Sequence, residues 1–184
     1  MAKPAVIIID MLKDFFEVGH LADTRNELVQ QINKLIKTAR SNCVPIIWVR
    51  QEFEPDLSDA FLAQRKENIR MTIKGTQGVE ILDELYRQPN DFEVVKKRYS
   101  AFYRTDLDEV LGKLRPSKLI LAGVNTHACI RMAAIDAYQR DFEVEVVSDC
   151  VSSKDQEHHR MTLDYMDGHI CKVVDLANLN LSSI

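Results

Sequence analysis

Two short runs of apolar residues without polar alternation constrain the fold most strongly. The runs are AVIII at Ala5–Ile9 and LILAGV at Leu119–Val124. A strand with one face in water alternates apolar and polar residues, so these runs are typical of strands buried on both faces, as in a parallel sheet. Both are far shorter than the roughly 20 residues that span a bilayer. The two runs therefore indicate a parallel sheet and no membrane partner.

Further β-rich runs alternate with longer amphipathic segments along the 184 residues. The predicted strands are 5–10, 44–49, 91–97, 118–124, 142–149 and 171–175. The predicted helices are 28–41, 59–66, 79–86, 107–114, 126–140 and 156–166. Parallel neighbouring strands need crossover connections, which helices supply. We therefore predict an α/β fold, with one doubly wound domain over residues 1–184. Its sheet is six-stranded and mostly parallel, with helices on both faces in a Rossmann-like arrangement.

Composition and motifs exclude several classes of partner. The 24 Lys and Arg residues against 28 Asp and Glu residues give a net charge of −4, which leaves no basic footprint for nucleic acid. The four cysteines lack zinc-ligand spacing, and no glycine-rich dinucleotide or P-loop motif follows a strand. Asp10 interrupts the first apolar run before it reaches the length of a signal peptide's core. We expect a cytoplasmic protein with reduced thiols and a small-molecule substrate.

Polar residues that follow strands are the candidates for chemistry, because ligands of open α/β sheets bind outside the carboxyl ends of the strands. Asp10 follows the first strand, Lys96 and Lys97 end the third, and Cys129 lies in the first turn of the helix after the fourth. We expect these three strands to be neighbours. The helix dipole is expected to lower the pKa of the Cys129 thiol, and the free N–H groups of that turn can hold an oxyanion.

Each candidate has a structural alternative when it is considered alone. Asp10 can bind the backbone of the following turn, and the two lysines can form a solvated strand end. Cys129 can be a small residue that packs the helix against the sheet.

Four segments resemble the isochorismatase-like cysteine hydrolase superfamily, which includes nicotinamidases and N-carbamoylsarcosine amidases. They are IIIDMLKDF at 7–15, KGTQGVEI at 74–81, VVKKRYSAFYRTDLDEVL at 94–111 and LILAGVNTHACIRMAAIDAYQRDFEVEVVSD at 119–149. The segments occur in the family's order and cover nearly the whole chain. The K-x-R-Y-S-A-F and G-V-x-T-x-x-C patterns are specific when they occur together.

The resemblance implies a catalytic triad of Asp10, Lys96 and Cys129, with Lys97 as a bystander. Asp10 takes the thiol proton, and the thiolate attacks a carbonyl carbon. Ammonia leaves, and water activated by Asp10 hydrolyses the thioester. Lys96 stabilises the anions, and no cofactor is needed.

The resemblance also implies how the oxyanion is held. It places a non-proline cis peptide between Val124 and Asn125, and it assigns the oxyanion hole to the N–H groups of Asn125 and Cys129.

Departures from the family pattern narrow the choice of reaction. Isochorismatases proper often lack the cysteine, so Cys129 favours C–N hydrolysis of a small amide, ureide or carbamoyl compound. The D-x-H metal motif of nicotinamidases is missing from Trp48–Asp56, so no metal is expected and nicotinamide is disfavoured as substrate. His127 stands where the family often has Asp, and Arg104 where a small residue is common. Two alternatives stay open: a vinyl-ether hydrolase with Asp10 as the acid, and a catalytically idle binding or scaffold protein.

The remaining expectations concern the pocket and the assembly. The expected substrate-binding residues are Phe15, Phe16, Gln51, Phe53 and Tyr99. The pair His158-His159 is interpreted as a solvated helix start, because adjacent residues do not share a helical face. The resemblance implies a homo-oligomer, a dimer or larger.

Overall fold

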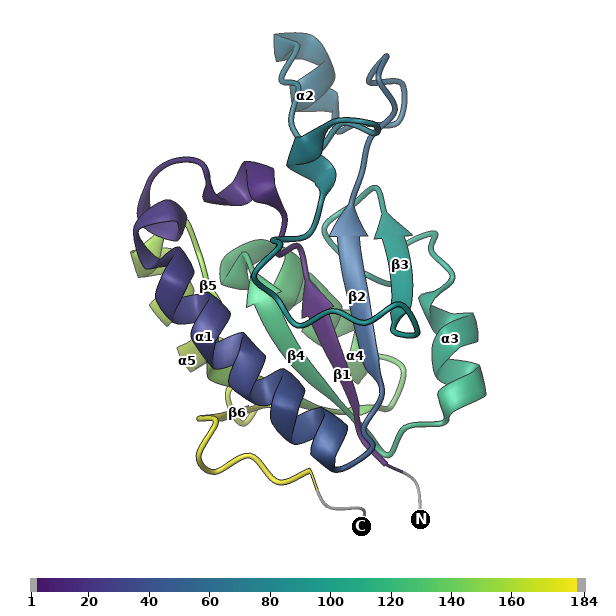
Figure 1. Cartoon of the computed structure of the whole chain (residues 1–184), viewed down its shortest axis with the longest axis vertical. Helices are drawn as coiled ribbons and strands as arrows, with labels where there is room; N and C mark the ends of the chain where they lie inside the picture. Colours follow the sequence, from purple (N-terminus) through teal and green to yellow (C-terminus); the bar gives the residue numbers. More distant parts are fainter. Residues whose placement is uncertain (1–2, 182–184) are drawn as a thin grey trace.

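Six strands form one parallel sheet in the computed structural model, which describes residues 3–181 (Figure 1). The strands are β1 (Ala5–Ile9), β2 (Ile46–Gln51), β3 (Phe92–Lys96), β4 (Lys118–Val124), β5 (Glu143–Ser152) and β6 (Lys172–Val174). Their order across the sheet is β3-β2-β1-β4-β5-β6, and each neighbouring pair is parallel. This is the doubly wound order whose direction reverses between β1 and β4. The predicted α/β fold is confirmed.

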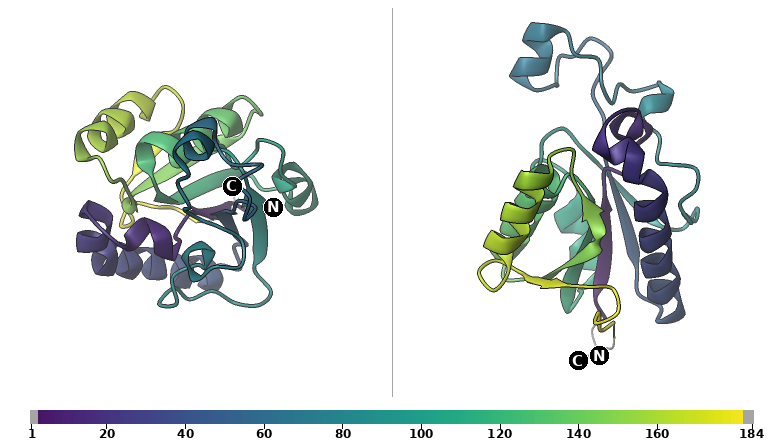
Figure 2. Two further views of the ribbon diagram at one scale, coloured as in Figure 1. Left: turned by 90° about the horizontal axis from the view of Figure 1, so that it is seen from above. Right: turned by 90° about the vertical axis from the view of Figure 1, so that its left-hand side faces the viewer.

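Helices cover both faces of the sheet (Figure 2). They are α1 (His20–Ser41), α2 (Leu62–Glu67), α3 (Leu107–Leu114), α4 (Arg131–Tyr138) and α5 (Gln156–Met166), with 3-10 turns η1 (Lys13–Phe16) and η2 (Gln77–Val79) and the π-helical turn η3 (Thr126–Ile130). Ile8 of β1 packs in the core on the α1 side, and its neighbours Ile7 and Ile9 pack in the core against α3 and α4. This two-sided burial is why β1 reads as a continuous apolar run. Within residues 3–181, no helix has the length and apolar character needed to cross a membrane.

The order of strands corrects one expectation. The first and fourth strands are neighbours, but β2 lies between β1 and β3. The registers place Ile9 opposite Val49 and Gly123, and Lys96 opposite Gln51. The carboxyl ends of these strands therefore lie at the same edge of the sheet, and only a long side chain from β3 can reach across β2 to the end of β1.

Two helix predictions also differ from the structure. Helix α1 begins at His20, eight residues before the predicted start, and the predicted helix at 79–86 is absent. In that segment Leu82 N–H donates to the Met11 carbonyl at 2.9 Å. The Asn33 side chain donates to the Glu84 carbonyl and accepts from Tyr86 N–H, both at 2.9 Å. Tertiary partners thus satisfy the backbone groups that helical hydrogen bonds would otherwise use.

Residues 52–73, which we call the arm, project beyond the carboxyl edge of the sheet (Figures 1 and 2). The arm carries α2, which buries none of its residues. The arm has its own small core of Phe53, Leu57, Ala60 and Ile73. It is therefore a separately packed extension above the strand ends.

Gly123 fixes the close approach of β1 and β4. It has a φ of +113°, and a Cβ atom there would lie 2.0 Å from the Ile9 carbonyl oxygen. A side chain at this position is excluded by both the backbone conformation and the space. Because Asp10 follows Ile9, the same contact sets the distance from Asp10 to the end of β4.

Replacing Gly123 with alanine is expected to destabilise the fold strongly. Gly123→Ala adds a backbone clash and a strained φ, and we expect a loss of about 3 kcal/mol or more in the free energy of unfolding. Urea titration followed by circular dichroism measures this value. Gly112→Ala in α3, where a Cβ meets nothing within 4 Å, is the matched control and should be neutral or stabilising by up to about 1 kcal/mol. Equal stability of the two variants would contradict the role given to Gly123.

Candidate active site

Asp10, Lys96 and Cys129 meet at the carboxyl edge of the sheet. Lys96 Nζ lies 2.6 Å from Asp10 Oδ2, and both side chains are fully buried. The same ammonium lies 3.4 Å from Cys129 Sγ, and the Cys129 side chain is also buried. The sequence thus predicted correctly that these three residues lie together, and they do so beside the switch point between β1 and β4.

Asp10 is held rigidly at the end of β1. Its φ is +55°, a left-handed conformation that is uncommon outside glycine. Its N–H donates to the Val49 carbonyl, and its Oδ1 accepts from the Gln51 N–H, each at 2.8 Å. One carboxylate oxygen is therefore fixed by the end of β2, and the other faces Lys96.

Lys96 is surrounded by acceptors. Besides Asp10 and Cys129, its ammonium reaches the Arg98 carbonyl at 3.2 Å and Gln51 Oε1 at 3.4 Å. Burial acts to lower the pKa of Lys96, but the charges of Asp10 and Cys129 and their hydrogen bonds raise it above its ordinary value. The lysine therefore remains a cation although it has no contact with water.

Cys129 lies in the π-helical turn η3, immediately before α4. The peptide bond between Val124 and Asn125 is cis. The N–H groups of Ala128 and Ile130 both donate to the Asn125 carbonyl, at 3.1 and 3.2 Å. This wide turn directs the Cys129 side chain into the core between α4 and the sheet, beside Lys96.

The expected low pKa of Cys129 is wrong. Burial raises the pKa of this thiol to about 12; Lys96 opposes the shift, and Asp10 adds to it. Desolvation outweighs the helix dipole because the sulfur is packed in the core rather than presented at an open helix end. The resting site therefore holds a protonated thiol beside a carboxylate–ammonium pair, and a base is needed to form the thiolate.

A second row of contacts fastens η3 to the segment 152–154. Asn125 Oδ1 accepts from the Lys154 N–H at 2.9 Å, and Thr126 Oγ1 donates to the Ser152 carbonyl at 3.0 Å. His127 Nδ1 is hydrogen-bonded to Ser153 Oγ. Asn125 and the first two residues of η3 thus bind three consecutive residues, Ser152 at the end of β5 and the two that follow it.

The expected substrate-binding residues do not all lie together. Gln51 is buried and contacts Lys96. Phe53 belongs to the core of the arm. Tyr99 is half exposed, and its ring lies 4.7 Å from that of Phe61 in the arm.

Phe16 is buried in the core on the α1 side, and Phe15 is partly buried and packs against the same core. Cys129 belongs to the core on the other face of the sheet.

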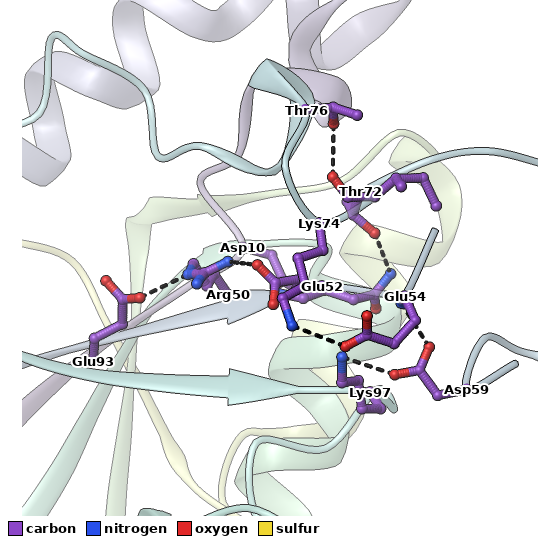
Figure 3. Close-up of polar contacts among 12 residues, drawn as sticks. Asp10, Arg50, Glu52, Glu54, Asp59, Thr72, Lys74, Thr76, Glu93 and Lys97 are labelled. Carbon is purple, nitrogen blue, oxygen red and sulfur yellow. Dashed lines mark hydrogen bonds and ion pairs between the residues drawn. The ribbon is translucent and has the colours of Figure 1, made fainter. Parts of the chain in front are cut away.

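Ion pairs hold the base of the arm beside the site (Figure 3). Lys97 Nζ binds Asp59 Oδ2 at 2.8 Å, and Lys74 Nζ binds Glu54 Oε1 at 3.1 Å. Thr72, near the C-terminal end of the arm in the sequence, accepts a hydrogen bond from Gln51 Nε2 of β2 at 3.4 Å. Lys97 therefore lies outside the Asp10–Lys96–Cys129 cluster and anchors the arm, while Lys96 contacts Asp10.

Sequence reasoning missed two supporting residues. His159 was interpreted as solvated, but it is partly buried and its Nδ1 lies 2.8 Å from Thr126 Oγ1, whereas His158 is exposed and pairs with Asp155. The sequence did contain a signal for the burial of His159, because it has helical spacing with Thr162 and Met166, the buried residues of α5. Asp136 of α4, which accepts a hydrogen bond from the buried Ser100 hydroxyl, had no such signal.

Within residues 3–181, no group of three or more His, Cys, Asp or Glu side chains is arranged so that it could hold a metal ion.

A doubly wound α/β fold with a buried Asp-Lys-Cys cluster at its switch point defines a class of small-molecule hydrolase candidates. A sequence model of the isochorismatase domain matches residues 4–178, and the chain belongs to this hydrolase family. A probable inactive nicotinamidase of Arabidopsis thaliana is 33% identical over 163 residues, covering 84% of this chain and 83% of the relative.

Solved structures show the same relationship. An isochorismatase family protein from Desulfovibrio vulgaris superposes with a TM-score of 0.88 at 28% identity, covering 96% of each chain. The N-carbamoylsarcosine amidase of Thermoplasma acidophilum superposes with a TM-score of 0.82 at 26% identity, covering 97% of this chain and 99% of that one.

The burial of Cys129 predicts slow alkylation in the resting protein. With a pKa of about 12, only about one thiol in 10⁴ is ionised at pH 8. We expect iodoacetamide to modify the exposed Cys43 first, and the rate at Cys129 to rise with pH up to about pH 12. Peptide mass spectrometry of timed samples between pH 7 and pH 11 measures both rates. Rapid modification of Cys129 at pH 7 would contradict the protonated resting thiol.

Proposed function

We propose that this protein is a cysteine-dependent hydrolase that acts on a small amide, ureide or carbamoyl compound and releases ammonia or an amine. The observation that supports this proposal is the contact of one buried ammonium with both Asp10 (2.6 Å) and Cys129 (3.4 Å). The likeness to an N-carbamoylsarcosine amidase supports the same class of substrate.

The first step is proton transfer within the buried cluster. The Cys129 thiol is protonated at neutral pH, and the Asp10 carboxylate, which lies close enough to raise its pKa, is the base that accepts the proton. The thiolate then attacks the carbonyl carbon, and a C–S bond forms. Lys96 compensates for the charge that moves between the carboxylate and the sulfur.

The second step is loss of the amine. The N–H groups of Asn125 and Cys129 hold the oxyanion of the tetrahedral intermediate. Asp10 returns its proton to the nitrogen as the C–N bond breaks, and the thioester remains on Cys129. A water molecule, deprotonated by Asp10, then hydrolyses the thioester and restores the thiol. The overall reaction consumes one water and yields a carboxylic or carbamic acid with ammonia or an amine.

A vinyl-ether hydrolase of the isochorismatase type is the second candidate, and the family assignment supports it. In that reaction Asp10 must start as an acid and protonate the substrate. In the structure Asp10 Oδ2 lies 2.6 Å from the Lys96 ammonium, so the thiol mechanism, in which Asp10 starts as the partner of that ammonium and accepts a proton from the thiol, fits the resting geometry better. A third candidate is an idle binding protein, because the Arabidopsis thaliana relative is a probable inactive nicotinamidase. The test below includes this candidate.

Removing either the nucleophile or the base is expected to abolish amide hydrolysis. Cys129→Ala and Asp10→Asn should each lower kcat/KM by about 10³-fold or more, because a step of the covalent route is lost. The measurement is ammonia release from a panel of small amides, ureides and carbamoyl compounds. Cys43→Ala, which removes the exposed thiol, is the control and should keep wild-type activity.

The other outcomes separate the candidates. Hydrolysis of isochorismate that survives Cys129→Ala but not Asp10→Asn would support the ether hydrolase. Folded wild-type protein that binds panel compounds without turning any of them over would support the idle binding protein.

A further inference from the structure

We propose that His159 is a positioning residue for the cysteine nucleophile, acting through the Thr126 hydroxyl. The inference rests on the proposed function, because it concerns how the turn that carries Cys129 is held. His159 Nδ1 lies 2.8 Å from Thr126 Oγ1, and Thr126 Oγ1 lies 3.0 Å from the Ser152 carbonyl oxygen. Thr126 is the first residue of η3, three residues before Cys129.

The direction of each hydrogen bond follows from the atoms involved. A hydroxyl has one proton to donate, and a carbonyl oxygen can only accept. Thr126 therefore donates to Ser152, and His159 donates its Nδ1–H to Thr126. This fixes neutral His159 in the Nδ1-protonated form and leaves Nε2 as an acceptor.

The surroundings of His159 keep it neutral. Burial lowers its pKa below the usual value, and the nearby His20 and His127 lower it further. His159 lines a cavity of about 310 Å³ between α1, β5 and α5, and the titratable groups that share this cavity are His20, Glu27 and Asp149. A neutral imidazole is thus fixed against a fully buried threonine.

These hydrogen bonds hold the start of the turn that carries Cys129. The turn η3 is only five residues long and has π-helical spacing, so it gains little stability from its own hydrogen bonds. The contacts of Thr126 with Ser152 and His159 fix its first residue from two sides. If they are lost, the turn loosens, water reaches Cys129, and the sulfur no longer stays in place beside Lys96.

The test measures alkylation of Cys129 by iodoacetamide at pH 9, which requires no substrate. We expect His159→Leu and the near-isosteric Thr126→Val to raise this rate about tenfold or more, the change produced when the pKa of a buried thiol falls by one unit. Thr126→Ser keeps the hydroxyl, and His159→Asn keeps a donor close to the Nδ1 position; both should stay near the wild-type rate. Where an amide substrate is available, kcat should fall in His159→Leu more than KM rises.

The chain supplies its own controls. Cys150 in β5 and Cys171 just before β6 are also buried but lie outside η3, and their alkylation should not change. The exposed His158, next in sequence, serves for comparison as His158→Ala and should leave the Cys129 rate unchanged. In the double variant Thr126→Val/His159→Leu, the rate should match that of Thr126→Val alone, because His159 acts through Thr126.

Three results would overturn the proposal. They are an unchanged Cys129 rate in folded His159→Leu, a parallel rise at Cys150 and Cys171 that reports general loosening, and effects of the two substitutions that multiply in the double variant. Because alkylation needs no turnover, a failure of the amidase proposal would appear only in the activity assay and leave these rates interpretable.

Discussion

The buried ion pair between Asp10 and Lys96 is the constraint to which the rest of the site conforms. Two charges without solvent are tolerated only when they are paired and their remaining hydrogen-bonding capacity is used. The Gln51 N–H and side chain and the Arg98 carbonyl supply those bonds. Because the partners come from β1 and β3, with β2 between them, the pair forms only when three strands have the right order and register. The edge of the sheet that carries the candidate active site therefore also helps to specify the order and register of the strands.

Burial of the thiol has a chemical meaning. An activated cysteine at an open helix end would be a thiolate at all times and open to oxidation and alkylation. Cys129 is instead a protonated side chain of the core, so in the proposed mechanism a nucleophile forms only when the base and a bound carbonyl group act together. The fastening of η3 to the segment 152–154 keeps the sulfur in that dry position.

The predictable parts of the fold and the site are those that sequence periodicity and motifs encode. The strand at Lys118–Val124 and the helix at Gln156–Met166 were predicted with their observed bounds, because both have strong patterns with clear boundaries. The segment 79–86 reads as a helix and is not one, since Leu82 and Asn33 bind it to distant residues. The high pKa of Cys129 was missed for the same reason, because its surroundings include Lys96, 33 residues away, which no local window reveals. The partial burial of His159, in contrast, is indicated by its helical spacing with Thr162 and Met166.

The adjacent lysines at the end of β3 show how strand length can encode function. Lys96 contacts Asp10, whereas Lys97 pairs with Asp59. The two lysines are chemically identical, so only their positions along the chain give them different partners. Successive residues of a strand point to opposite faces. A one-residue deletion upstream within β3 would bring Lys97 beside Asp10 and Arg98 into the place of Lys97 near Asp59, while a one-residue insertion would bring Val95 beside Asp10 and remove the cation there. In evolution, this strand can therefore shorten by one residue with less chemical loss than it can lengthen.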